Sequence, residues 1–106
     1  MYKATTPTFK LIIPYTVEEI NNFVISLVQQ GITVLTLTRG DCDLEDHLVS
    51  FTLTQEQSNV FVHRYPINLQ MRIMLNSEKV VACAVEQIDV HRVLNDTILV
   101  VDGKYR

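Results

Sequence analysis

The sequence predicts an all-β protein, an antiparallel β-sandwich with one short helical turn near residues 54–61. Three observations support this fold class. Apolar and polar residues alternate with a period of two in several segments, as they do in strands with one buried face. β-Branched residues are frequent in these segments. The segments are short, and polar turn-like stretches separate them.

The first half of the chain predicts three strands. Residues 9–15 place four apolar side chains on one face: Phe9, Leu11, Ile13 and Tyr15. Pro14 has no backbone N–H to donate, so this strand ends there or lies at a sheet edge. Residues 21–28 are apolar enough for a helix, but their β-branched residues and the following Gly31 favour a strand and a turn at residues 29–31. Residues 32–38 alternate again and predict the third strand.

The second half predicts another strand, a helical turn and a hairpin. Residues 48–53 alternate, with three side chains expected to point inward: Val49, Phe51 and Leu53. Thr54 and Gln57 have the spacing of a capping box, which predicts a helix start. Residues 67–75 show the clearest alternation in the chain. The polar stretch 76–79 predicts a turn, and the β-branched run that follows predicts the second strand of a hairpin.

The chain is expected to form one domain, because 106 residues, 47% of them hydrophobic, suffice for a single core. Residues 1–7 contain two threonines and Pro7, and predict an extended N-terminal arm. Residues 8–94 form the predicted sandwich domain. Residues 95–106 begin and end with polar residues, and predict either a C-terminal docking tail or an added edge strand.

Composition disfavours two classes of partner. The formal net charge is −3, whereas domains that bind nucleic acid usually carry a basic excess. No apolar run is long enough to cross a membrane, and the N-terminal residues lack the pattern of a signal peptide. We therefore expect no nucleic acid and no membrane as partner, and synthesis in a cytoplasm. We expect Cys42 and Cys83 to be free thiols in that compartment, because reducing conditions disfavour a disulfide.

Residues 38–47, TRGDCDLEDH, combine four carboxylates, a cysteine, a histidine and an Arg-Gly-Asp tripeptide. The spacing differs from that of a calcium loop, and the chain has no local Cys or His pair of the kind that anchors zinc. The carboxylates beside Cys42 should raise the pKa of its thiol and make it less reactive. A polar turn with Leu44 pointing inward is the favoured interpretation. Binding of a cation by residues 41–46 stays open, and Asp41 and Asp43 are candidate contact residues.

No catalytic template is recognisable. The sequence has no nucleophile–base pair, no metal spacing and no glycine-rich phosphate loop, so we expect neither an enzyme, nor a cofactor, nor a small-molecule substrate. His63, Arg64 and Tyr65 precede Pro66. They are interpreted either as a loop entering a strand or as a protein-contact patch, in which Tyr and Arg are favoured anchors.

Three stretches in order resemble a known family: TPTFKLIIPY at residues 6–15, GDCDLEDHLVSFTLTQEQSNVF at 40–61, and INLQMRIMLNSEKVVACAVEQIDVHRVLND at 67–96. They are similar to small uncharacterised structural-type proteins of tailed phages and prophages of gut Firmicutes. The likeness lies in the order and spacing of these pieces. The second half also resembles the N-terminal β-sandwich of phage baseplate upper proteins.

The resemblance implies an immunoglobulin-like sandwich that serves as a virion part and carries no catalytic residues. It also implies that residues 41–45 form an inter-strand turn. A glycine often follows the Leu-Glu pair in that family, whereas Asp46 and His47 stand here, so the turn is expected to be longer or looser.

The predicted function is that of a phage structural or assembly protein docking on capsid, connector, tail or baseplate. Its expected partners are other virion proteins, in a homo-oligomer or a larger assembly, and its expected location is the virion after synthesis in the bacterial cytoplasm. The alternative is a stand-alone module that binds a host protein or a carbohydrate, although the lack of Trp disfavours a sugar. The predicted contact residues are Thr5, Thr6, Pro7, Asp41, Asp43, His63, Arg64, Tyr65, Thr97, Ile98, Leu99, Val100 and Val101.

Overall fold

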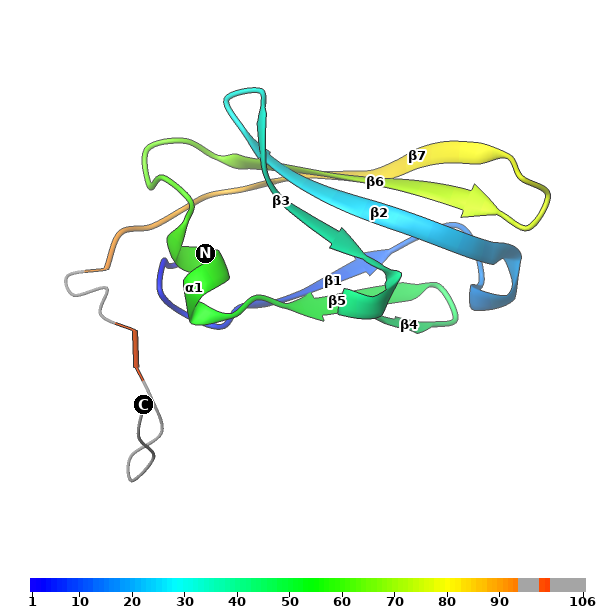
Figure 1. The fold of residues 1–106 in the computed structure, drawn as a ribbon, viewed down its shortest axis with the longest axis horizontal. Coiled ribbons are helices and arrows are strands. Elements are labelled where there is room, and N and C mark those ends of the chain that lie inside the picture. The colour runs from blue at the N-terminus through cyan, green and yellow to red at the C-terminus, as the bar shows by residue number, and fades with distance from the viewer. Residues whose placement is uncertain (94–97, 100–106) are drawn as a thin grey trace.

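Two antiparallel β-sheets face each other in the computed structural model, as the predicted all-β sandwich requires (Figure 1). The structure describes residues 1–93 and 98–99, and for residues 83–85 it describes the backbone alone. One sheet has three strands and the other has four. Within the described residues, no helix is long and apolar enough to cross a membrane.

The three-stranded sheet has the order β1-β5-β4, formed by Thr8–Ile12, Leu48–Thr52 and Asp43–Glu45. β1 is an edge strand that ends two residues before Pro14, as predicted from the missing N–H of proline. The expectation of a turn was wrong for residues 43–45, which form β4. Asp46, with a φ of 47°, reverses the chain so that these three residues can pair with β5.

The four-stranded sheet has the order β3-β2-β6-β7, formed by Ile32–Thr38, Ile20–Gln29, Ile67–Leu75 and Val80–Ile88. The predictions of a strand rather than a helix for β2, and of a hairpin for β6 and β7, are confirmed. Gln30 and Gly31 join β2 to β3 with φ values of 52° and 76°. Two successive left-handed residues are the geometry that tight hairpins favour.

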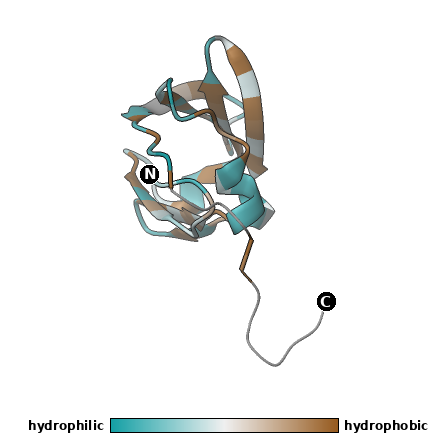
Figure 2. Cartoon of the chain, turned by 90° about the vertical axis from the view of Figure 1, so that its left-hand side faces the viewer, coloured by the Kyte–Doolittle hydropathy of each residue, from teal (hydrophilic) through white to brown (hydrophobic). Residues whose placement is uncertain are grey.

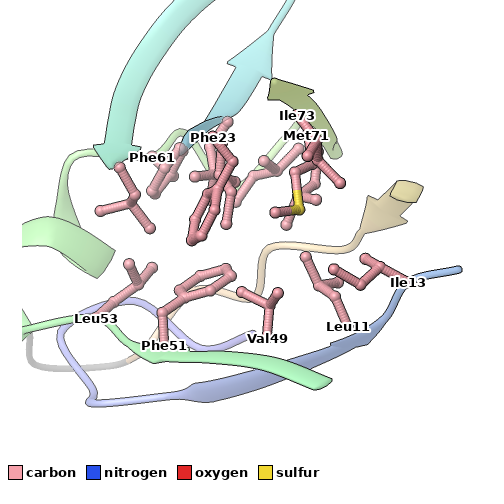
Figure 3. Close-up of a cluster of buried hydrophobic side chains, with 14 of the residues drawn as sticks. Leu11, Ile13, Phe23, Val49, Phe51, Leu53, Phe61, Met71 and Ile73 are labelled. Atoms are coloured by element: carbon pink, nitrogen blue, oxygen red, sulfur yellow. The ribbon is translucent and has the colours of Figure 1, made fainter. Parts of the chain in front are cut away.

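The core lies between the sheets, and strand alternation fills it from both sides (Figure 3). The predicted inward residues Val49, Phe51 and Leu53 are all buried. Seen from the end that carries the short helix Gln55–Asn59, the strands alternate between apolar and polar residues along their length (Figure 2). The outer faces therefore carry polar side chains, while one contiguous apolar cluster joins the two sheets.

Candidate interaction surface

Helix α1, Gln55–Asn59, begins with the capping box that the sequence predicts. The backbone N–H of Gln57 donates to Thr54 Oγ1 at 3.1 Å, and the backbone N–H of Thr54 donates to Gln57 Oε1 at 2.9 Å. These bonds satisfy backbone donors that a helix start would otherwise leave unpaired. The helix is only five residues long, so the capping box and the packing around it fix the directions of its side chains.

Ser58 of α1 binds the N-terminal segment. Its side chain is fully buried, and its Oγ donates to the Thr5 carbonyl at 2.7 Å and accepts from the Thr5 N–H at 3.0 Å. The backbone N–H of Leu53 donates to the Pro7 carbonyl at 3.0 Å. Thr5 to Pro7, predicted as part of an extended arm, therefore lie against α1 and the end of β5.

Residues 1–3 pair with the chain that follows β7. The N–H of His91 donates to the Met1 carbonyl at 2.7 Å, and the N–H of Lys3 donates to the His91 carbonyl at 3.1 Å. The rings of Tyr2 and His91 lie 5.1 Å apart between centroids. Since β7 belongs to one sheet and residues 1–7 lead into β1 of the other, this N-terminal segment connects the two sheets.

Gln29, at the end of β2, holds the loop that carries His63 and Arg64. Its Nε2 donates to the carbonyls of Val62 and Tyr65 at 2.8 and 2.9 Å, and its Oε1 accepts from the Val62 N–H at 2.9 Å. The Gln29 side chain is buried, whereas the three loop residues 63–65 are exposed. One buried amide thus determines how the predicted contact patch is presented to solvent.

Gln29 was missed as a functional residue, although the sequence contains a signal for it. Gln29 follows Phe23, Ile25 and Leu27 in the set of alternate β2 residues that point inward. A polar side chain at an inward position must find hydrogen-bond partners, because an unpaired buried amide is costly. The sequence could therefore have indicated a buried bonding role for Gln29, but not that residues 62–65 supply the partners.

Gln55, the first residue of α1, binds the C-terminal segment. Its Nε2 donates to the Leu99 carbonyl at 2.8 Å, and its Oε1 accepts from the Leu99 N–H at 2.7 Å. Ile98 is half-buried, and the Leu99 side chain is 73% exposed. The other predicted contact residues of this segment, Thr97, Val100 and Val101, lie outside the described residues.

We call the end of the sandwich that carries α1 the α1 end (Figure 1). Nine large apolar side chains are exposed within the described residues. Three lie at the opposite end, at the end of β1 and the β6–β7 turn: Ile12, Met74 and Val80. The other six are Tyr2, Ile32, Val60, Val62, Tyr65 and Leu99. Val60, Val62 and Tyr65 follow α1 in the chain, Tyr2 and Leu99 belong to segments bonded to α1, and Ile32 starts β3 opposite Gln29. More of the exposed large apolar side chains therefore lie toward the α1 end than toward the opposite end.

Asp41 and Asp43 do not join this surface. Asp41 ends a short 3₁₀ helix, Arg39–Asp41, and its carboxylate accepts from the backbone N–H of Thr38 at 2.9 Å. The Arg39 guanidinium donates to the carbonyls of Ile20 and Asn21 at 3.0 and 2.9 Å. Both charged groups of the Arg-Gly-Asp tripeptide are thus bound to the protein's own backbone, while Asp43 is exposed on β4.

Residues 38–47 also do not bring metal ligands together. Within the described residues, no three His, Cys, Asp or Glu side chains come close enough to hold one ion. Two open, mostly apolar depressions lie elsewhere. One is lined by β2, β6 and β7 around Arg72, and the other lies between Ile12 and residues 45–48. Neither depression lies at the α1 end.

No protein-family model, curated protein or solved structure matches this chain.

Cys42 is expected to react slowly with alkylating reagents. Burial, and then the neighbouring carboxylates of Asp41 and Asp43, raise the pKa of its thiol to about 11 from 9.0. At pH 8 the thiolate fraction, and with it the rate of reaction with iodoacetamide, should be about 100-fold lower than for an unperturbed thiol. The rate should rise as the pH approaches 11. Mass spectrometry of the Cys42 peptide measures this rate, and the chain unfolded in urea is the control. Equal rates in the folded and unfolded chains would contradict the prediction.

Proposed function

We propose that this protein is a structural or assembly component of a tailed-phage virion, and that it docks on its neighbours through the α1 end. The observation that carries the docking surface is that six of the nine exposed large apolar side chains of the described residues lie on the chain that follows α1, on segments bonded to α1, or at the start of β3. The sequence resemblance supports a tailed-phage virion as the particle. The proposed role is non-enzymatic and needs no cofactor.

Burial of the α1 end in an interface would remove exposed apolar side chains from water. Grouped exposed apolar residues are typical of protein contact sites, because their removal from water favours association. Tyr65 and Arg64 are of the residue types that most often dominate binding energy. The bonds from Gln29 and Ser58 already hold the surrounding backbone. The surface therefore loses little conformational entropy on binding.

We also propose that the fold is a variant of the immunoglobulin-like sandwich. Seven strands divided into three and four match the number in constant-type immunoglobulin domains. In those domains the second strand lies beside the first and fifth. Here β2 lies between β3 and β6, so the proposed variant moves one strand to the opposite sheet.

The proposal is tested by incorporation into particles of the source phage or induced prophage. The double variant Val60→Ser, Val62→Ser changes the α1 end, and Met74→Ser, Val80→Ser is a matched control at the opposite end. Mass spectrometry of purified particles quantifies each chain against the major capsid protein. We expect the α1-end variant to fall at least about tenfold, since two buried valines contribute several kcal/mol to binding, and the control to stay unchanged.

The copy number of the unmodified chain identifies its station in the particle. A number equal to that of the capsid protein indicates head decoration, and a few to a few dozen copies indicate a connector, tail or baseplate. Absence of the chain from particles would contradict the virion role. Equal incorporation of both double variants would contradict the choice of the α1 end.

A further inference from the structure

A second exposed apolar site lies on the three-stranded sheet, at the end of the sandwich opposite α1. Ile12 of β1 and its partner Leu48 of β5 line an open, mostly apolar depression of about 360 Å³ together with residues 45–47, and we call it the β1–β5 depression. Ile12 is 84% exposed, more than any other exposed large apolar side chain of the described residues. Such a side chain favours contact with another apolar surface, because the contact removes both from water.

The β1–β5 depression has an acidic rim. Glu45 and Asp46 line it, and both are exposed. The exposed charged residues of β1, the 3₁₀ helix Val17–Glu19, residues 45–48 and the β6–β7 turn are Lys10, Glu18, Glu19, Glu45, Asp46, Glu78 and Lys79. Because carboxylates outnumber lysines at this end, a contact between two copies of the same end would bring like charges together and oppose association. A complementary surface is therefore apolar and carries a cation.

Residues 60–65, which follow α1, have this complementary character. Val62 and Tyr65 are exposed, and the exposed Arg64 lies between them in the chain. The stretch contains no carboxylate. Its backbone is already held by the bonds from Gln29, so these side chains are presented together before any partner arrives. An arginine flanked by apolar side chains matches an apolar depression with carboxylates, because guanidinium and carboxylate form strong, paired hydrogen bonds.

We infer that residues 60–65 of one copy dock in the β1–β5 depression of a second copy, with Arg64 against its carboxylates. The inference rests on the assembly role proposed above and names the partner as a second copy of this chain. Helix α1 and the turn between β4 and β5 lie at opposite ends of the sandwich, so both surfaces of one copy can be occupied at once (Figure 1). Such a head-to-tail contact repeats into a ring or a filament. Met74 and Val80, on the other sheet, do not line the depression.

Sedimentation equilibrium of the full chain, from micromolar to millimolar concentration, tests the inference. The average mass should grow beyond that of a dimer as the concentration rises, since each copy has two different contact surfaces. Arg64→Glu reverses the charge on one surface, and Ile12→Asp places a carboxylate in the other. We expect each variant to weaken self-association at least about tenfold, because each sets like charges against each other and the second also loses apolar contact. Arg72→Glu makes the same change of charge at an exposed position outside both surfaces, and should associate like the unmodified chain.

Mixing the two variants separates a head-to-tail contact from a symmetric one. Ile12→Asp keeps residues 60–65 intact, and Arg64→Glu keeps the depression intact, so the mixture should form heterodimers and nothing larger. An unmodified chain that stays monomeric overturns the inference, as does a dimer that does not grow further or an Ile12→Asp variant that associates like the unmodified chain.

The same measurements distinguish this inference from the virion role. Self-association of the pure chain, together with its absence from purified particles, would contradict the virion role and leave the head-to-tail contact standing. A chain that is found in particles but stays monomeric when pure would overturn the head-to-tail contact alone.

Discussion

Replacing Gln29 with leucine is expected to lower the free energy of unfolding by about 2–4 kcal/mol. Leucine fills a similar volume but offers no hydrogen bonds. The carbonyls of Val62 and Tyr65 and the N–H of Val62 would then lose their partner. Equilibrium unfolding in urea measures the change, and hydrogen exchange should show faster exchange at the Val62 amide.

Gln70→Leu is the matched control for this prediction. Gln70 is exposed on the outer face of β6, where its amide can be replaced at little cost. We expect a change within about 0.5 kcal/mol for this variant. Equal effects of the two substitutions would mean that the Gln29 bonds do not stabilise the loop.

Replacing Phe61 with alanine is expected to cost about 3–5 kcal/mol of unfolding free energy. Phe61 follows α1 almost directly, is fully buried, and points into the core between the sheets (Figure 3). Its loss removes a large apolar contact and leaves a cavity that neighbouring side chains fill only in part. Urea unfolding measures the loss, and an unchanged slope with denaturant would show that the rest of the fold persists.

Phe9→Ala is a useful comparison. Phe9 is half-buried on the edge strand β1, with its ring 5.3 Å from that of Phe51 between centroids. Because part of this ring already faces water, its removal should cost clearly less than that of Phe61. A loss of stability below about 2 kcal/mol for Phe61→Ala would contradict the contribution of this side chain to the core.

Features with a local cause could be predicted from the sequence. Alternation placed Val49, Phe51 and Leu53 inward, because successive residues of a strand point to opposite faces. The capping box at Thr54 was readable because both partners lie within one helical turn. Pro14 likewise predicted the end of an edge strand from its own chemistry.

Features that depend on distant partners could not be predicted. β4 is a strand only because β5 lies beside it, and three residues are too few to show a period. The alternation of apolar and polar residues in β2 also does not indicate that this strand lies between β3 and β6.

The candidate surface shows the same limit. Thr5, Tyr65 and Leu99 were predicted as contact residues, but the side chains that hold their segments at the α1 end were not. Those side chains are Ser58, Gln29 and Gln55.

The pairing of β1 with β5 has a consequence for how the chain acquires its fold. Thr8 and Thr52 are opposite partners 44 residues apart, whereas β2 and β3 meet across a two-residue turn. Pairings across long loops form late, because the entropy of loop closure is lost before any contact compensates for it. We expect folding on the millisecond-to-second scale typical of such sandwiches. During synthesis, β1 is made before β5, so it has no strand to pair with until β5 has also been made.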